Sequence, residues 1–215
     1  MPNHVTNRIQ ATTAVIHSML DESGQVDFAK IIPFPGEWPW DDVSEAAQAA
    51  ADIALNVPLH ENVTITNWQA KNRESSSIAA LPERDFEQFI QMLRNFRATG
   101  FMHYLSFTRE NWGTKWNAYE QEIDAAAGKV KFDTAWSCPI PVLQALSASH
   151  PTELIEVQFA DEDLGSNCGT IHFKAGEIVH HDVSPGWQQL NEEGQKRREA
   201  FAYEVKGYDP EDDQW

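Results

Sequence analysis

Residues 110–118 read E-N-W-G-T-K-W-N-A, and residues 129–141 read K-V-K-F-D-T-A-W-S-C-P-I-P. The first segment places a glycine between two tryptophans, which is typical of a turn between two elements of regular structure. In the second segment, Val130 and Phe132 alternate with charged residues, and this spacing predicts a strand with one buried and one solvated face. A short helix is predicted directly after it, at residues 139–149. Together the two segments predict the middle of a folded sheet.

Further strands and helices are predicted on both sides of this stretch from hydrophobic periodicity and turn residues. The segments predicted as strands are residues 5–11, 61–69, 101–107, 119–123, 155–159, 170–174 and 178–181, with a short extended piece at residues 28–32. The other segments predicted as helices are residues 15–20, 41–56, 83–98 and 185–205. Residues 70–80 are predicted to form a loop, because they are polar and lack periodicity.

The helix predicted at residues 83–98 carries a stripe of phenylalanines. Phe86, Phe89 and Phe96 recur at the spacing of one face of a helix, with Ile90 between them. We interpret this stripe as a contact with the core rather than as a cofactor site.

This order of strands, helices and turns predicts an α+β protein in which helices pack on one face of a mostly antiparallel sheet. We predict a single domain over residues 1–215 with an insertion around residues 33–100, where residues 58–82 show the least periodicity. A helix is predicted near the C-terminus, and the final residues, 207–215, form an acidic tail that we expect to be frayed.

Composition is typical of a globular protein, because 41% of the residues are hydrophobic and 11% are aromatic. No run of about 18 apolar residues could span a membrane, and residues 1–8 lack the apolar core of a signal peptide. These features predict a cytoplasmic protein in which Cys138 and Cys168 stay reduced. We interpret both cysteines as small buried hydrophobic residues.

The formal net charge is -17, from 33 acidic and 16 basic residues. A field of this sign repels phosphate backbones and therefore disfavours direct binding to nucleic acids. It favours a partner protein with a basic surface. The alternative is that the surplus of acids only keeps the chain in solution.

Four motifs carry a resemblance to a known family. They are M-P-N-H-V-T-N-R-I at residues 1–9, E-N-W-G-T-K-W-N-A and F-D-T-A-W-S-C-P-I-P in the middle, and F-A-D-E-D-L-G-S-N-C-G at residues 159–169. Together they resemble the YubB-like proteins of phages and conjugative plasmids, most strongly over residues 111–176. The resemblance implies a ferredoxin-like sheet and a mobile-element origin inside a bacterial host. It implies no catalytic residues, because that family has no assigned biochemical activity.

The turn at residues 112–117 is the first candidate site. As a functional site, two exposed indoles beside a lysine could stack on a base or ring of a ligand. As a structural element, the tryptophans would pin a tight loop in which glycine supplies the turn. Both interpretations involve the same residues, which are Trp112, Gly113, Lys115, Trp116 and Asn117.

The second candidate is residues 33–42, P-F-P-G-E-W-P-W-D-D, which combine aromatic side chains with acids in an irregular segment. Tryptophan is often at the energetic centre of a protein interface. The segment is therefore a candidate partner surface, and the alternative is that its aromatic rings fold back over the core. The candidate residues are Phe34, Trp38, Trp40, Asp41 and Asp42.

A cation site is considered at residues 161–172, which begin D-E-D-L-G-S-N. A calcium loop of the EF-hand type needs glycine at its sixth position and glutamate at its twelfth, where this chain has Ser166 and His172. We therefore predict a solvated connection between strands. The weak candidates for a metal ligand are Asp161, Asp163 and His172.

Histidines near the C-terminus could add ligands to such a site. His180 and His181 are neighbours, so on a strand they point to opposite faces, and at most one can join His172. Two ligands are too few to predict a transition-metal centre.

No sequence motif of nucleotide-binding loops, zinc hydrolases or serine hydrolases is present, and we expect no cofactor. The first hypothesis is a non-enzymatic acidic protein that binds a host protein, such as a defence or nucleic-acid-handling factor with a basic groove. The alternative is a module that binds a small molecule or nucleotide on the sheet face and at residues 112–117, with Lys115 or Arg109 on an anion. A third hypothesis is a metal-dependent hydrolase or nuclease whose metal is held by Asp161, Asp163 and a histidine.

Overall fold

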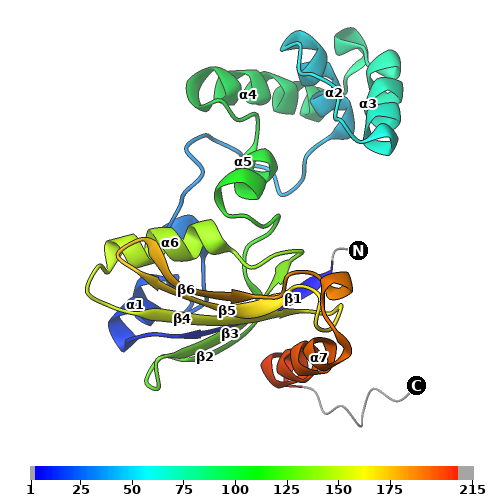
Figure 1. The fold of residues 1–215 in the computed structure, drawn as a ribbon. Coiled ribbons are helices and arrows are strands. Elements are labelled where there is room, and N and C mark those ends of the chain that lie inside the picture. Colours follow the sequence, from blue (N-terminus) through cyan, green and yellow to red (C-terminus); the bar gives the residue numbers. More distant parts are fainter. Residues whose placement is uncertain (1–2, 208–215) are drawn as a thin grey trace. The chain divides into compact units, whose positions relative to one another are not determined.

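The computed structural model describes residues 3–207 and separates the chain into two compact units. The sheet unit consists of Met1–Pro33 and Thr108–Trp215, and the helical unit consists of Phe34–Phe107 (Figure 1). No helix of the described residues has the length and apolar character needed to cross a membrane.

The insertion predicted around residues 33–100 covers nearly the same interval as the helical unit. A single domain over the whole chain stays a prediction. The predicted acidic tail at residues 207–215 lies outside the described residues, except for Gly207.

Six strands form one antiparallel sheet in the spatial order β2-β3-β1-β4-β5-β6. Their bounds are β1 His4–Gln10, β2 Tyr119–Asp124, β3 Lys129–Ala135, β4 Ile155–Asp161, β5 Cys168–Lys174 and β6 Glu177–Val183. The predicted α+β class with a mostly antiparallel sheet is confirmed. Strands β2 and β6 lie at the edges, and β1 pairs with β3 and β4 on its two sides.

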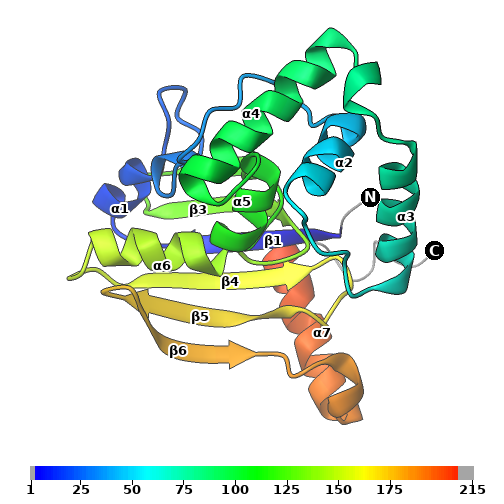
Figure 2. The ribbon, with the colours of Figure 1, turned by 90° about the horizontal axis from the view of Figure 1, so that it is seen from above.

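Helices of the sheet unit lie on both faces of the sheet, and the other unit consists of helices (Figure 2). The sheet unit contains α1 Thr13–Ser18, α6 Ile140–Ser149 and α7 Glu192–Lys206, with 3₁₀ turns at Phe28–Lys30 and Trp187–Gln189. The helical unit contains α2 Glu45–Ala54, α3 Val63–Ser75 and α4 Glu83–Thr99, with a 3₁₀ turn at Ile78–Ala80. Helix α5, Tyr104–Asn111, runs across the boundary between these chain segments.

The inner face of the sheet builds the core of the sheet unit. Strand register brings Val130, Ile9 and Val157 side by side, and each is at most 2% exposed. Helix α6 lies over this face (Figure 1) and adds fully or nearly fully buried leucines and a valine. The rings of Phe28 and Phe132 meet edge to face with 5.6 Å between their centroids, which fixes the 3₁₀ turn against β3.

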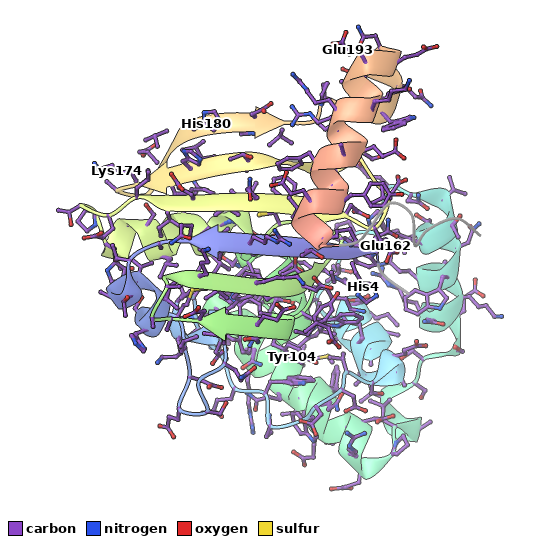
Figure 3. The ribbon with its side chains drawn as sticks, turned by 90° about the horizontal axis from the view of Figure 1, so that it is seen from below. His4, Tyr104, Glu162, Lys174, His180 and Glu193 are labelled. Carbon is purple, nitrogen blue, oxygen red and sulfur yellow. The ribbon has the colours of Figure 1, made fainter. Side chains whose placement is uncertain are left out.

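The outer face of the sheet is covered at one end by the C-terminal helix α7 (Figure 3). Ala202 and Val205 of α7 pack against Ala160 and Cys168, which point outward from β4 and β5. Helix α7 begins at residue 192, because residues 185–191 contain a glycine, a 3₁₀ turn and the capping asparagine. The rest of the outer face is not covered by a helix of the sheet unit, and its side chains are polar.

Both cysteines are buried thiols, as their interpretation from sequence predicts. Burial raises the pKa of the Cys138 thiol and of the Cys168 thiol above the ordinary value. Neither sulfur is therefore an activated nucleophile.

In the helical unit, small residues of α2 meet large residues of α4. Ala47, Ala50 and Ala51 pack against Phe89 and Met92, and all five are at most 5% exposed. Alanine on one helix allows the larger side chains of the other helix to approach closely, so this pair of helices forms the core of the unit.

The phenylalanine stripe of α4 is only partly a core contact. Phe89 is 5% exposed, but Phe86 and Phe96 are each 38% exposed. The buried face of α4 is completed by Met92 and Asn95 instead. The prediction was therefore wrong for Phe86 and Phe96, because their positions lie at the margins of the face that α2 covers.

The strand predicted at residues 61–69 and the loop predicted at residues 70–80 are wrong, because α3 occupies Val63–Ser75. The side chain of Asn62 accepts hydrogen bonds from the backbone N–H groups of Thr64 and Ile65, at 3.0 and 3.3 Å, and starts the helix. No residue of α3 is buried, so the β-branched residues that suggested a strand have no sheet to join.

Two further segments predicted as extended are helical. Residues 101–107 were predicted as a strand, but the buried residues of this region, His103, Phe107 and Thr108, recur at helical spacing. Residues 28–32 contain a 3₁₀ turn, which is capped by Asp27.

We predict that the position of a valine in the sheet decides what its truncation costs. Val157→Ala on central β4, where the side chain is fully buried, should lower the free energy of unfolding by about 2–3 kcal/mol. The same change at Val179 on edge strand β6, which is 57% exposed, should cost less than about 0.5 kcal/mol. Urea unfolding of both variants measures the difference, and equal costs would contradict the assignment of the inner face.

Candidate functional site

The outer face of the sheet carries two adjacent rows of polar side chains, one residue from each strand. From β2 to β6, the first row is Asp124, Lys129, Gln10, Glu156, His172 and His180. The second row is Glu122, Lys131, Arg8, Gln158, Thr170 and Asp182. Directly paired residues of antiparallel strands point to the same face, so these side chains form one continuous polar surface.

The residues of these rows on β2, β3, β1, β4 and β5 line a groove with a volume of about 660 Å³, which we call the sheet groove. Its basic residues are Arg8, Lys129 and Lys131, and carboxylates flank them on β2 and β4. The Lys131 ammonium forms an ion pair with Glu122 at 2.8 Å. This hydrogen bond, with the charges of Lys131 and Arg8, lowers the pKa of the Glu122 carboxyl.

The histidine end of the first row lies on β5 and β6. The rings of His172 and His180 are tilted by 37° with their centroids 4.7 Å apart. His180 is therefore the neighbour that joins His172 on one face. Between residues 3 and 207, no three histidine, cysteine or carboxylate side chains come close enough to hold a metal ion.

The metal candidates Asp161, Asp163 and His172 are not brought together. Asp161 pairs with Val5 and points inward, whereas His172 points outward. The Asp161 carboxylate accepts hydrogen bonds from the side chains of Asn3 and Asn167, each at 3.0 Å, and from the backbone of Asp163 at 2.9 Å. This carboxylate fastens the β4–β5 connection to the N-terminus, and the metal-dependent hydrolase is not supported.

The turn at residues 112–117 is built as a structural element. Trp112 is 7% exposed, its indole N–H donates to the carbonyl of Ile32 at 2.8 Å, and its ring lies edge-on to Phe28. The side chain of Asn117 accepts from the Phe28 backbone at 2.9 Å and donates to the Asp27 carboxylate at 2.7 Å. These bonds hold the turn against the 3₁₀ turn at residues 28–30.

The pair of exposed indoles that the functional interpretation requires is therefore absent, because Trp112 is in the core. Gly113 has a φ of +73°, which supports the turn as predicted. Trp116 is 37% exposed, and the Lys115 ammonium lies 4.8 Å from the centre of its ring. What remains at the surface is one cation–π pair, and its residues do not line the sheet groove.

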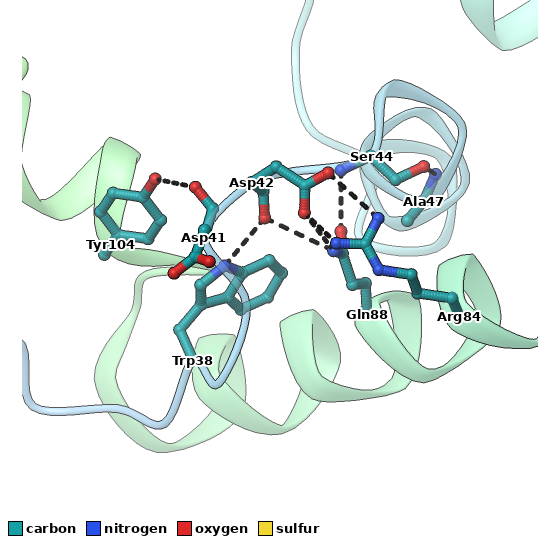
Figure 4. A network of polar contacts seen from close by, with 8 residues as sticks. All are labelled: Trp38, Asp41, Asp42, Ser44, Ala47, Arg84, Gln88 and Tyr104. Atoms are coloured by element: carbon teal, nitrogen blue, oxygen red, sulfur yellow. Dashed lines mark hydrogen bonds and ion pairs between the residues drawn. The ribbon is translucent and has the colours of Figure 1, made fainter.

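In the helical unit, a network of polar contacts orders residues 38–44 (Figure 4). The Asp42 carboxylate forms an ion pair with both terminal nitrogens of Arg84, and its backbone carbonyl accepts from the Trp38 indole at 3.1 Å. The buried Gln88 accepts from the Ser44 backbone at 2.7 Å and donates to the Asp42 carbonyl at 3.4 Å. An irregular segment is thereby fixed to the start of α4.

Aromatic rings surround this network. Trp38 and Trp40 meet with 4.9 Å between their ring centroids, and the Tyr104 hydroxyl donates to the carbonyl of Asp41 at 3.2 Å. Burial, and then the charges of Asp41 and Asp42, raise the pKa of the Tyr104 hydroxyl. Asp41 and Asp42 themselves are exposed.

We call Trp38, Trp40, Asp41, Asp42, Arg84 and Tyr104 the acidic–aromatic surface. Four of these six residues are sequence candidates, and the fifth candidate, Phe34, packs on Phe107 instead, with 5.5 Å between ring centroids. Sequence reasoning missed Arg84 and Tyr104. Arg84 lies in the acidic first turn of α4, and the capping pattern around Pro82 could have drawn attention to it.

Comparison with known proteins supports the fold and gives no activity. Residues 115–204 match the model of a family described as the ferredoxin-like domain in Api92-like protein, which confirms the predicted ferredoxin-like fold. The crystal structure of a protein Api92 from Yersinia pseudotuberculosis is 11% identical, with 85% of this chain and 98% of that chain covered and a TM-score of 0.39. No curated protein matches the chain.

We predict that the two tryptophans of the turn differ in their contribution to stability. Trp112→Phe removes a buried indole that bonds to Ile32, and it should lower the free energy of unfolding by about 1–3 kcal/mol. Trp116→Phe changes an exposed ring and should cost less than about 0.5 kcal/mol. Denaturant unfolding measures both, and a larger cost for Trp116→Phe would contradict a structural role of the buried indole.

We also predict how the Asp42 carboxyl titrates. The hydrogen bond and charge of Arg84 lower its pKa below the ordinary 3.8, so their stabilising effect is present above that pH and is lost as pH falls through the lowered value. Arg84→Gln should return the pKa of Asp42 toward 3.8 in an NMR titration of its carboxyl carbon. Arg94→Gln, an exposed arginine of the same helix, is the matched control and should leave that pKa unchanged.

Proposed function

We propose that this chain is a non-enzymatic binding protein that engages a partner protein through the acidic–aromatic surface. The observation that carries the proposal is the set of hydrogen bonds and the ion pair that hold this surface in an irregular segment. Trp38 is bonded to Asp42, Asp42 to Arg84, and Tyr104 to Asp41. Surfaces that are ordered before binding lose less conformational entropy on association, and binding energy concentrates on such aromatic residues.

The carboxylates and indole rings of the acidic–aromatic surface favour a partner with a basic surface. Among the described residues, the Asp41 carboxylate forms no ion pair, and Asp85 adds negative charge near Arg84. An arginine of the partner could pair with Asp41 and stack on the half-exposed indoles of Trp38 and Trp40. The net charge of -17 would raise the association rate with a positively charged protein.

The partner class rests on the sequence resemblance to YubB-like proteins. A mobile-element origin would place the chain in the cytoplasm of a bacterial host, where a defence or nucleic-acid-handling factor has the required basic groove. The acidic field would imitate phosphate charge for such a partner, and it disfavours binding to nucleic acid itself.

The proposal predicts salt-sensitive capture of a basic host protein. Full-length chain on a resin should retain that protein from bacterial lysate at low salt and release it as salt rises. Asp41→Lys, which leaves the backbone bond to Tyr104 in place, should weaken binding about tenfold or more, and Trp40→Ala should also weaken it.

The matched control is Glu22→Lys, an exposed charge reversal in the sheet unit, which should bind like the unmodified chain. Two outcomes would contradict the proposal. One is that nothing is retained at low salt, and the other is that Asp41→Lys and Glu22→Lys weaken binding equally.

A further inference from the structure

We propose that the sheet groove binds a small organic anion through a phosphate or carboxylate group. Three of the 16 basic residues of this acidic chain converge there, on two neighbouring strands. Arg8 is the direct cross-strand partner of Lys131, and Lys129 lies one row away on the same strand. The acidic–aromatic surface belongs to the other unit, so the two proposals are independent of each other.

The pairing of Arg8 with Lys131 is unfavourable in the absence of a ligand. Like charges directly opposite each other on neighbouring strands destabilise a sheet. Lys131 forms an ion pair with Glu122, and the charge of Arg8 also acts on that carboxylate. The Arg8 guanidinium itself forms no direct hydrogen bond or ion pair with a residue in the described part of the chain. A half-buried arginine held beside a lysine by strand register is an arrangement that an anion would stabilise.

Neutral donors continue the site on the other side of Arg8. Gln158 is its partner on β4, and Thr170 follows on β5. Neither side chain makes a hydrogen bond with a described residue, so both can donate to oxygen atoms of a ligand. Arg8, Gln158 and Thr170 stand on β1, β4 and β5, which are neighbouring strands about 4.8 Å apart. Strands hold these donors more rigidly than loops would.

The dimensions and lining of the groove restrict the size of the anion. A volume of about 660 Å³ lies within the roughly 300–1,000 Å³ of small-molecule sites. Carboxylates of Asp124 and Glu156 border the basic residues and would repel a long polyanion. His172 supplies the one aromatic ring among the described lining residues, whereas single-stranded nucleic acids are bound on several stacking rings. The ligand is therefore a compact anion and not a nucleic-acid strand.

An NMR titration tests the site. Isotope-labelled full-length chain is titrated with inorganic phosphate, with citrate and with a thymidine oligonucleotide, at constant ionic strength. Phosphate or citrate should cause saturable amide shifts in β1, β3, β4 and β5 at residues that line the groove. Arg8→Gln should weaken this binding about tenfold, because the charge-assisted hydrogen bonds are lost.

The matched control is Lys196→Gln, which removes one exposed positive charge from α7 and should leave binding unchanged. Thermal unfolding gives a second measurement, in which phosphate should raise the melting temperature of the unmodified chain but not of Arg8→Gln. Without ligand, Arg8→Gln should unfold at the same or a higher temperature, because it relieves the like-charge pair.

Three outcomes would overturn the inference. They are no saturable shift with either small anion, shifts that Arg8→Gln and Lys196→Gln affect equally, and tighter binding of the oligonucleotide than of phosphate in the groove.

Discussion

The register of β1 between β3 and β4 is the constraint on which the sheet unit depends. Side chains alternate between the two faces of a strand, so one register sends Ile9 and Val157 inward and Arg8 and Lys131 outward. A slip of one residue would exchange the two sets, burying charges and exposing the core. The hydrophobic core and the sheet groove are therefore two consequences of the same strand pairing.

The acidic residues have different surroundings on the sheet and in the helical unit. On the outer face of the sheet, the basic residues Arg8, Lys129 and Lys131 lie beside the carboxylates of Glu122 and Asp124, so opposite charges partly cancel there. In the helical unit, Glu45 and Asp85 lie in the first turns of α2 and α4, where negative charge is favourable near the helix dipole. Part of the net charge thus stabilises helices, and Arg84, in the first turn of α4, forms an ion pair with Asp42.

Sequence periodicity predicted the elements that bury one face. Apolar residues recur at every second position in β1, β3, β4 and β5, and at helical spacing in α4. Each of these elements was predicted close to its observed bounds. The first half of helix α3 was predicted as a strand because β-branched residues and a tryptophan occur in it, and the second half was predicted as a loop. Whether a neighbouring strand is available for pairing cannot be read from the sequence of this segment. In the structure the segment has no strand to pair with, and α3 buries no residue.

The sequence by itself determined the α+β class, the buried thiols and the segment at residues 33–42 as a surface worth testing, since these follow from local period and composition. Only the tertiary structure decided that Trp112 lies in the core, that Tyr104 reaches Asp41, and that Arg8 stands beside Lys131. These pairs are separated by dozens of residues or more along the chain. Their meeting depends on strand register and helix packing, which no local pattern of residues specifies.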